Sequence, residues 1–88
     1  MGSAFRYIQR MSLRLRVAPR TYRVVDFAVY AGEEPTEDMP SAPPFVAIEI
    51  VSPDEIFDEL MKKLHEYHVW GVPHVWGVPH VWLVDPQL

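Results

Sequence analysis

A six-residue repeat near the C-terminus limits how this chain folds. Residues 68–82 read HVWGVPHVWGVPHVW, with no other internal repetition in the sequence. Each Gly-x-Pro step stops a helix or strand at that point. Solenoid units run about 20–50 residues and need at least three copies, so this repeat does not indicate a solenoid. Removing one copy leaves an amphipathic helix, a break and a β-branched, aromatic strand, which indicates an insertion into a helix–turn–strand unit.

The hydrophobic pattern predicts the remaining elements. Alternating apolar and arginine-rich positions are typical of a half-exposed strand, and longer apolar runs are typical of buried ones. Ser52, Pro53 and Glu55 match a capped helix start. The expected elements are strands at 10–17, 22–30, 45–51 and 80–85, a loop at 31–44 and a helix from about 53 to 70.

The order β-β-β-α-β predicts the α/β (α+β) class, with a mixed sheet and one main helix. One helix covers one face of such a sheet, so the other face has no obvious cover. The 88 residues suit a single domain over 1–88, within which residues 1–11 carry no clear pattern. No cysteine is present, which excludes a disulfide, a thiol nucleophile and a zinc–thiolate site.

The chain lacks any apolar run long enough for a signal peptide or a membrane span. A cytoplasmic protein without membrane contact is therefore expected. Charge is divided unevenly: residues 1–25 hold all six arginines, and residues 26–88 hold two lysines and all twelve acidic residues. The basic stretch suits either contact with phosphate or neutralisation of the acidic remainder within the fold.

Two carboxylates lie within apolar strands. Asp26 stands in VVDFAVY and Glu49 in FVAIEIV. A buried carboxylate must be paired, protonated or bound to a metal. At about 100° per residue, Lys63 falls within the apolar stripe of the helix, near Ile56 and Tyr67, and so points toward the strands. The three groups suit either a structural ion pair between Lys63 and Glu49 or a divalent cation site.

Four ordered motifs carry a family resemblance: RVVDFAVY, PPFVAIEIVSP, ELMKKLHEY and GVPHVWLVDP. Together they resemble the Uma-two family of restriction endonucleases, within the PD-(D/E)XK nuclease superfamily. The resemblance covers roughly residues 13–86 and implies a restriction-endonuclease-like fold acting on DNA. It implies Mg²⁺ ligands at Asp26, Glu49 and the backbone carbonyl of Ile50, and a catalytic role for Asp26, Glu49 and Lys63. Val51 stands where other superfamily members carry that lysine.

The resemblance also implies elements before the first strand and after Asp85-Pro86 that this chain lacks. A truncated domain with weak or absent catalysis of DNA hydrolysis is therefore expected. The alternative is an inactive remnant whose repeat drives strand exchange. The repeated histidines and tryptophans are interpreted as copies of the end of the helix and the start of the last strand. Their six-residue spacing is not that of a metal site.

The repeat predicts self-association. A shift of six residues keeps every side chain on its own face of a strand. Either copy could thus fill the place beside the third strand, leaving a tryptophan-bearing copy to be buried elsewhere. We expect a homodimer or higher oligomer in which the terminal strand is exchanged and the tryptophans lie at the interface.

Overall fold

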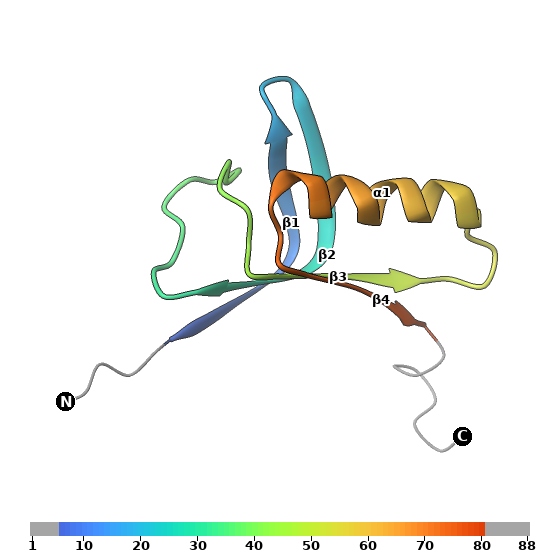
Figure 1. Ribbon diagram of the computed structural model, residues 1–88. Helices are drawn as coiled ribbons and strands as arrows, with labels where there is room; N and C mark the ends of the chain where they lie inside the picture. The colour runs from blue at the N-terminus through green and yellow to red at the C-terminus, as the bar shows by residue number, and fades with distance from the viewer. Residues whose placement is uncertain (1–5, 81–88) are drawn as a thin grey trace, which may run out of the picture.

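The computed structural model describes residues 6–80, which form a four-stranded sheet with a helix across one face (Figure 1). The elements are β1 (Tyr7–Ala18), β2 (Thr21–Ala31), β3 (Val46–Val51), α1 (Phe57–Trp70) and β4 (His74–Pro79). This order and the mixed α/β class confirm the sequence prediction and are consistent with a restriction-endonuclease-like fold.

The strands lie side by side in chain order, β1-β2-β3-β4. β1, β2 and β3 pair antiparallel, whereas β3 and β4 run parallel. Parallel neighbours need a crossover connection, and α1 supplies it. β1 begins earlier than expected because Tyr7 pairs with Ala31 at the far end of β2. The alternation of buried and exposed side chains along β1 is interrupted at Ser12, which has a φ of 50°.

The helix starts later than the sequence motif predicts. The Ser52 carbonyl accepts a hydrogen bond from the Glu55 N–H at 3.1 Å, so Ser-Pro-Asp-Glu forms a turn instead of the first helical residues. Ile56 occupies the N-cap position without a side-chain cap, and it is 60% exposed instead of lying in the buried stripe. The C-terminal end is as expected, since Gly71 adopts a φ of 120° and closes the helix.

The last strand differs from the prediction in position. The middle unit of the repeat, at His74–Pro79, forms β4, and residues 81–85 of the predicted strand at 80–85 lie outside the described residues. A Cβ added at Gly77 would lie 3.3 Å from Val51 Cγ2 and 3.7 Å from Leu64 Cδ1. Six residues after Gly77, just past the end of the repeat at Trp82, the chain carries Leu83 at the equivalent position. A six-residue shift thus preserves the face of each side chain but changes its size at the helix-facing position.

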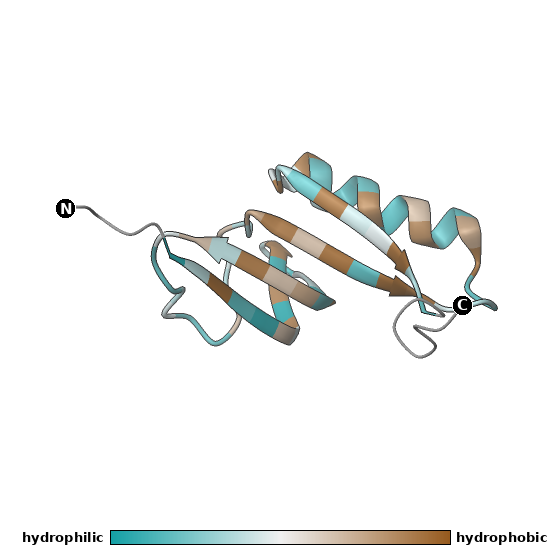
Figure 2. Cartoon of the chain, turned by 90° about the horizontal axis from the view of Figure 1, so that it is seen from below, coloured by the Kyte–Doolittle hydropathy of each residue, from teal (hydrophilic) through white to brown (hydrophobic). Residues whose placement is uncertain are grey.

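The side of the sheet facing α1 contains the main core. Its fully or almost fully buried members are Leu15, Val25, Ala28, Tyr30, Ala47, Tyr67 and Val72. Residues paired directly across a sheet share a face. On the face away from α1, Ile48 of β3 pairs with Phe27 and Trp76, and Phe27 pairs with Met11. We call these four residues the apolar row. Figure 2 shows their face with no described element across it.

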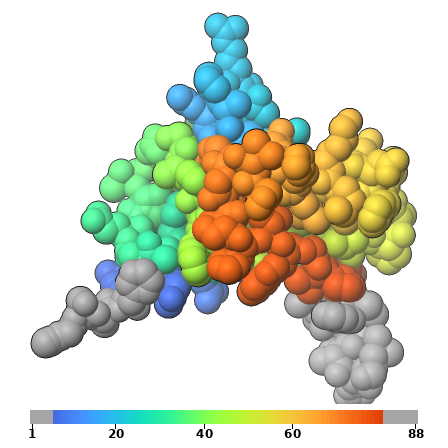
Figure 3. Space-filling view, in the orientation of Figure 1, coloured from blue at the N-terminus to red at the C-terminus, as the bar shows by residue number. Residues whose placement is uncertain are grey.

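The β1–β2 hairpin bends away from β3 (Figure 1). The pairing of β2 with β3 covers Phe27 to Val29 and stops there, although β2 continues back to Thr21. The tip of the hairpin stands clear of the other elements in the space-filling view (Figure 3). The strands therefore separate at Asp26 and Glu49, next to the sheet-facing side of α1.

Candidate functional site

Glu49 is the buried acid at the centre of the site. It lies on the helix-facing side of β3, two residues after Ala47, and is 4% exposed. α1 supplies a partner for each carboxylate oxygen. Lys63 Nζ lies 3.2 Å from Oε1, and the Tyr67 hydroxyl donates to Oε2 at 2.8 Å. Lys62 is exposed.

These surroundings act on the protonation of Glu49 in opposite directions. Burial raises the pKa of the Glu49 carboxyl, and this is the largest effect. The Tyr67 hydrogen bond and the Lys63 ammonium lower that pKa, while the Asp26 charge raises it. Burial and the hydrogen bond to Glu49 also raise the pKa of the Tyr67 hydroxyl, which therefore stays protonated as a donor.

Asp26 lies where β2 leaves β3. Continuing the register one step beyond Phe27 and Ile48 would set Asp26 opposite Glu49. Instead, Asp26 Oδ2 accepts a hydrogen bond from the Ile50 N–H at 2.7 Å, which gives that backbone group a side-chain partner. Asp26 is thus bonded to the backbone next to Glu49, at the point where the two strands part.

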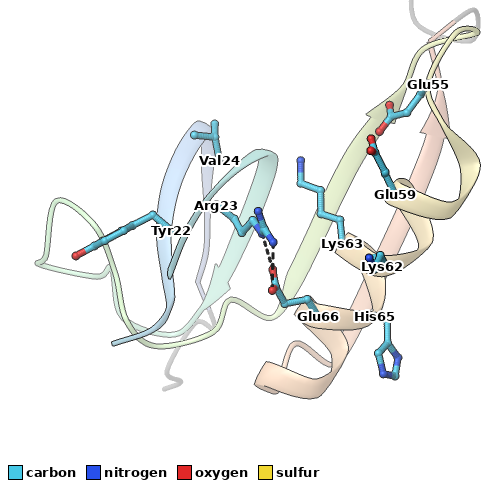
Figure 4. Close-up of a pocket in the computed structure, with 9 residues that line it drawn as sticks. All are labelled: Tyr22, Arg23, Val24, Glu55, Glu59, Lys62, Lys63, His65 and Glu66. Atoms are coloured by element: carbon cyan, nitrogen blue, oxygen red, sulfur yellow. Dashed lines mark hydrogen bonds and ion pairs between the residues drawn. The ribbon is translucent and has the colours of Figure 1, made fainter. Parts of the chain in front are cut away.

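A cleft of about 710 Å³ opens between the hairpin and α1 (Figure 4). Its lining residues are Tyr22, Arg23, Val24, Glu55, Glu59, Lys62, Lys63, His65 and Glu66. Lys63 is the member of the expected site that lines this cleft, and its side chain is 30% exposed. Asp26 and Glu49 do not line it. Lys63 therefore connects the cleft with the buried acid.

An ion pair crosses the cleft from the hairpin to α1. Arg23 Nε lies 2.5 Å from Glu66 Oε1, and a second guanidinium nitrogen donates to Oε2 at 3.3 Å (Figure 4). The hydrogen bond that Arg23 donates to Glu66 raises the pKa of the Arg23 guanidinium. Arg10 of β1 pairs with Glu34, in the loop that follows β2. Part of the basic stretch thus neutralises acidic residues within the fold.

Two contributors were missed by the sequence interpretation. Tyr67 was assigned only to the apolar stripe, although its position four residues after Lys63 places both side chains on one helix face. That spacing was the available signal. Arg23 and Glu66 are 43 residues apart in the sequence, and their pairing depends on the bend of the hairpin, for which the sequence offered no signal.

The donor atoms of the site suit a hard cation. Carboxylate oxygens of Asp26 and Glu49 and a backbone carbonyl are ligands that Mg²⁺ accepts. No group of three His, Cys, Asp or Glu side chains within residues 6–80 is placed to hold a metal ion. Mg²⁺ is commonly held by one or two carboxylates, with waters and substrate phosphates completing its shell. The hydrogen bond to Ile50 uses only Oδ2 of Asp26, so the residues fit an ion shared with a substrate.

The repeat histidine within β4 has a packing role. The His74 ring lies edge-on to Phe45, with ring centroids 4.8 Å apart.

Among the described helices, none is long and apolar enough to span a membrane.

A family model matches nearly the whole chain. The model of the Uma2 family, described as "Putative restriction endonuclease", matches residues 2–88. Neither the curated proteins nor the solved structures include a significant match. The matched region contains the separated strands, the buried Glu49 and the lysine-bearing helix. The chain belongs to the Uma2 family of restriction-endonuclease-like proteins.

Proposed function

We propose that this protein is a cytoplasmic, Mg²⁺-dependent endonuclease that hydrolyses DNA phosphodiester bonds. The observation that carries the proposal is the contact of Lys63 with Glu49, because it links an open cleft to a buried acid near Asp26. Buried acids with perturbed pKa values beside a cleft are typical of functional sites. Family membership supports the same class of reaction.

Each residue has a separate role in this proposal. Asp26, Glu49 and the Ile50 carbonyl would hold Mg²⁺, which supplies Lewis-acid chemistry at a phosphate. Lys63 moves from Glu49 Oε1 to the phosphate and neutralises the negative charge that develops there. Arg23 at the cleft can exchange Glu66 for a backbone phosphate, since guanidinium groups bind both anions in a two-point manner.

We expect turnover to be slow. Lys63 is paired with Glu49 and must leave this partner to reach a substrate. The cleft also has one wall formed by a hairpin that separates from β3. A displacement of about 1 Å in a positioning group can lower a rate by roughly 100-fold.

Nicking of supercoiled plasmid DNA tests this proposal. We expect Mg²⁺-dependent nicking that is stopped by chelation and abolished by Glu49→Gln. Glu59→Gln is the matched control, because Glu59 lines the cleft on α1 but does not contact Asp26 or Lys63 through any described hydrogen bond or ion pair. Nicking that persists in Glu49→Gln, or that does not need a divalent cation, would contradict the proposal.

A second candidate function is self-association, in which the domain is an inactive remnant and the repeat drives strand exchange. The observation that favours association is the apolar row, whose Met11 and Trp76 side chains are 71% and 52% exposed. Among the described strands, β4 also has a neighbour on one side only. Exposed apolar patches and free strand edges favour contact with a second chain.

Light scattering at micromolar concentration distinguishes this candidate. We expect a dimer or higher oligomer for the native chain and a monomer for Trp76→Gln. Deletion of residues 71–76, which removes one copy of the repeat, tests strand exchange separately. If the deletion variant keeps the same oligomeric state and stability as the native chain, the repeat does not drive assembly.

A further inference from the structure

Tyr67 has an unusual position for a core aromatic residue. Its side chain is fully buried, and its hydroxyl donates to Glu49 Oε2 at 2.8 Å. Lys63, one helical turn earlier, contacts Oε1 of the same carboxylate at 3.2 Å. One helix face therefore holds both oxygens of Glu49 and fixes the rotation of the carboxylate plane relative to β3.

The two helix partners differ in mobility and charge. Lys63 is 30% exposed on its side chain and borders the cleft, so it can move toward a bound phosphate. Tyr67 is enclosed in the core with Leu15, Val25 and Val72. When Lys63 leaves, Tyr67 is the remaining helix partner that still orients Glu49.

We infer that Tyr67 is a positioning residue that holds the Glu49 carboxylate in the orientation required for divalent metal binding while Lys63 engages the substrate. The inference rests on the proposed metal-dependent nuclease function. It adds a residue whose contribution is made through Glu49 and not through contact with the substrate.

The hydrogen-bonding capacity of a carboxylate permits both interactions. An ionised carboxylate has about four lone-pair positions, so one donor on each oxygen leaves positions for a cation. Partners that orient a metal ligand typically affect metal affinity by about 10–100-fold when removed. The Tyr67 hydroxyl is neutral, so it orients Glu49 without repelling the cation.

Tyr67→Phe tests this role, because it removes the hydroxyl and keeps the ring in the core. Tyr30→Phe is the matched control. Tyr30 is also buried, at 6% exposure, and its hydroxyl donates to the Ala42 carbonyl at 3.0 Å, away from the acid. Mn²⁺ serves as the probe, with affinity measured by calorimetry and stability by thermal unfolding.

We expect Tyr67→Phe to weaken Mn²⁺ binding by about 10-fold or more and to raise the metal concentration needed for half-maximal nicking. Tyr30→Phe is expected to lower the melting temperature by a similar amount while leaving Mn²⁺ affinity unchanged. If the native protein binds Mn²⁺ and Tyr67→Phe binds it equally well, the positioning role is wrong and the proposed function stands. If both tyrosine variants lose affinity equally, the effect is general loosening and the positioning role is also wrong. If the native protein binds no Mn²⁺, both the inference and the proposed function are overturned.

Discussion

The two faces of β3 differ in how their side chains are buried and paired. Facing α1, Ala47 is fully buried and Glu49 is 4% exposed, with partners from the helix. Facing away, Ile48 continues the apolar row toward a half-exposed Trp76. An acid is thus enclosed on one face while a tryptophan meets solvent on the other. Within the described residues, β3 thus separates a buried, paired acid on one face from exposed apolar side chains on the other.

Truncation of one aromatic residue from each face should give the largest difference. Tyr67→Ala is expected to lower the free energy of unfolding by about 3–5 kcal/mol, because it leaves a cavity in the core and a buried acid with one fewer partner. Trp76→Ala, although it removes a larger side chain, should cost less than about 1 kcal/mol, since Trp76 is 52% exposed.

Urea unfolding at submicromolar concentration, where association is suppressed, measures both values. Similar losses in free energy for the two variants would show that the open face is as well packed as the covered one, and the contrast would fail.

Removal of the Lys63 charge should have a smaller effect that depends on pH. Lys63→Met leaves Glu49 with Tyr67 as its helix partner and is expected to cost about 1–2 kcal/mol at pH 7. Burial raises the pKa of Glu49 above its ordinary 4.5, so the folded state binds this proton more tightly than the unfolded state. The free energy of unfolding therefore falls as the pH rises from 4.5 through the raised pKa.

Lys63 limits this fall, because its charge lowers the pKa of Glu49. The cost of Lys63→Met should thus be present at pH 7 and disappear below pH 4.5, where the carboxyl is protonated in both states. Denaturant unfolding over this pH range, with the exposed Lys62→Met as control, measures it. A cost that is the same at low and neutral pH would point to lost packing of the lysine stem.

The smallest effect is expected for the ion pair across the cleft. Arg23 and Glu66 have side chains that are 43% and 34% exposed, so solvent screens their attraction. A double-mutant cycle with Arg23→Gln and Glu66→Gln should give a coupling of about 0.2–1 kcal/mol that decreases with added salt. A coupling that does not change with salt would indicate that the pair is shielded from solvent, contrary to its exposed fractions.

The sequence predicted the class, the order of the elements along the chain and the helix face bearing Lys63, because these depend on local periodicity. It misplaced the helix start, since the turn from Ser52 to Glu55 competes with the cap that the same residues could form. It could not choose between the segments that start at His74 and at His80, because both have the same alternation of side chains. They differ at the position facing Leu64, which is Gly77 in one and Leu83 in the other. The sequence also could not predict the cleft, because its two walls, the hairpin and α1, face each other only after the hairpin bends away from β3.

The position of β4 at the edge of the sheet makes the repeat an easy place for the chain to change length. Each unit has an even number of residues, so gaining or losing one keeps every following side chain on its own face of the strand. Among the described strands, β4 has one neighbour, so an added unit of six residues can extend the chain by up to about 20 Å past these strands without inserting between them. Variation in copy number would thus leave Glu49, Lys63 and Tyr67 in place while the C-terminal end of the molecule evolves separately.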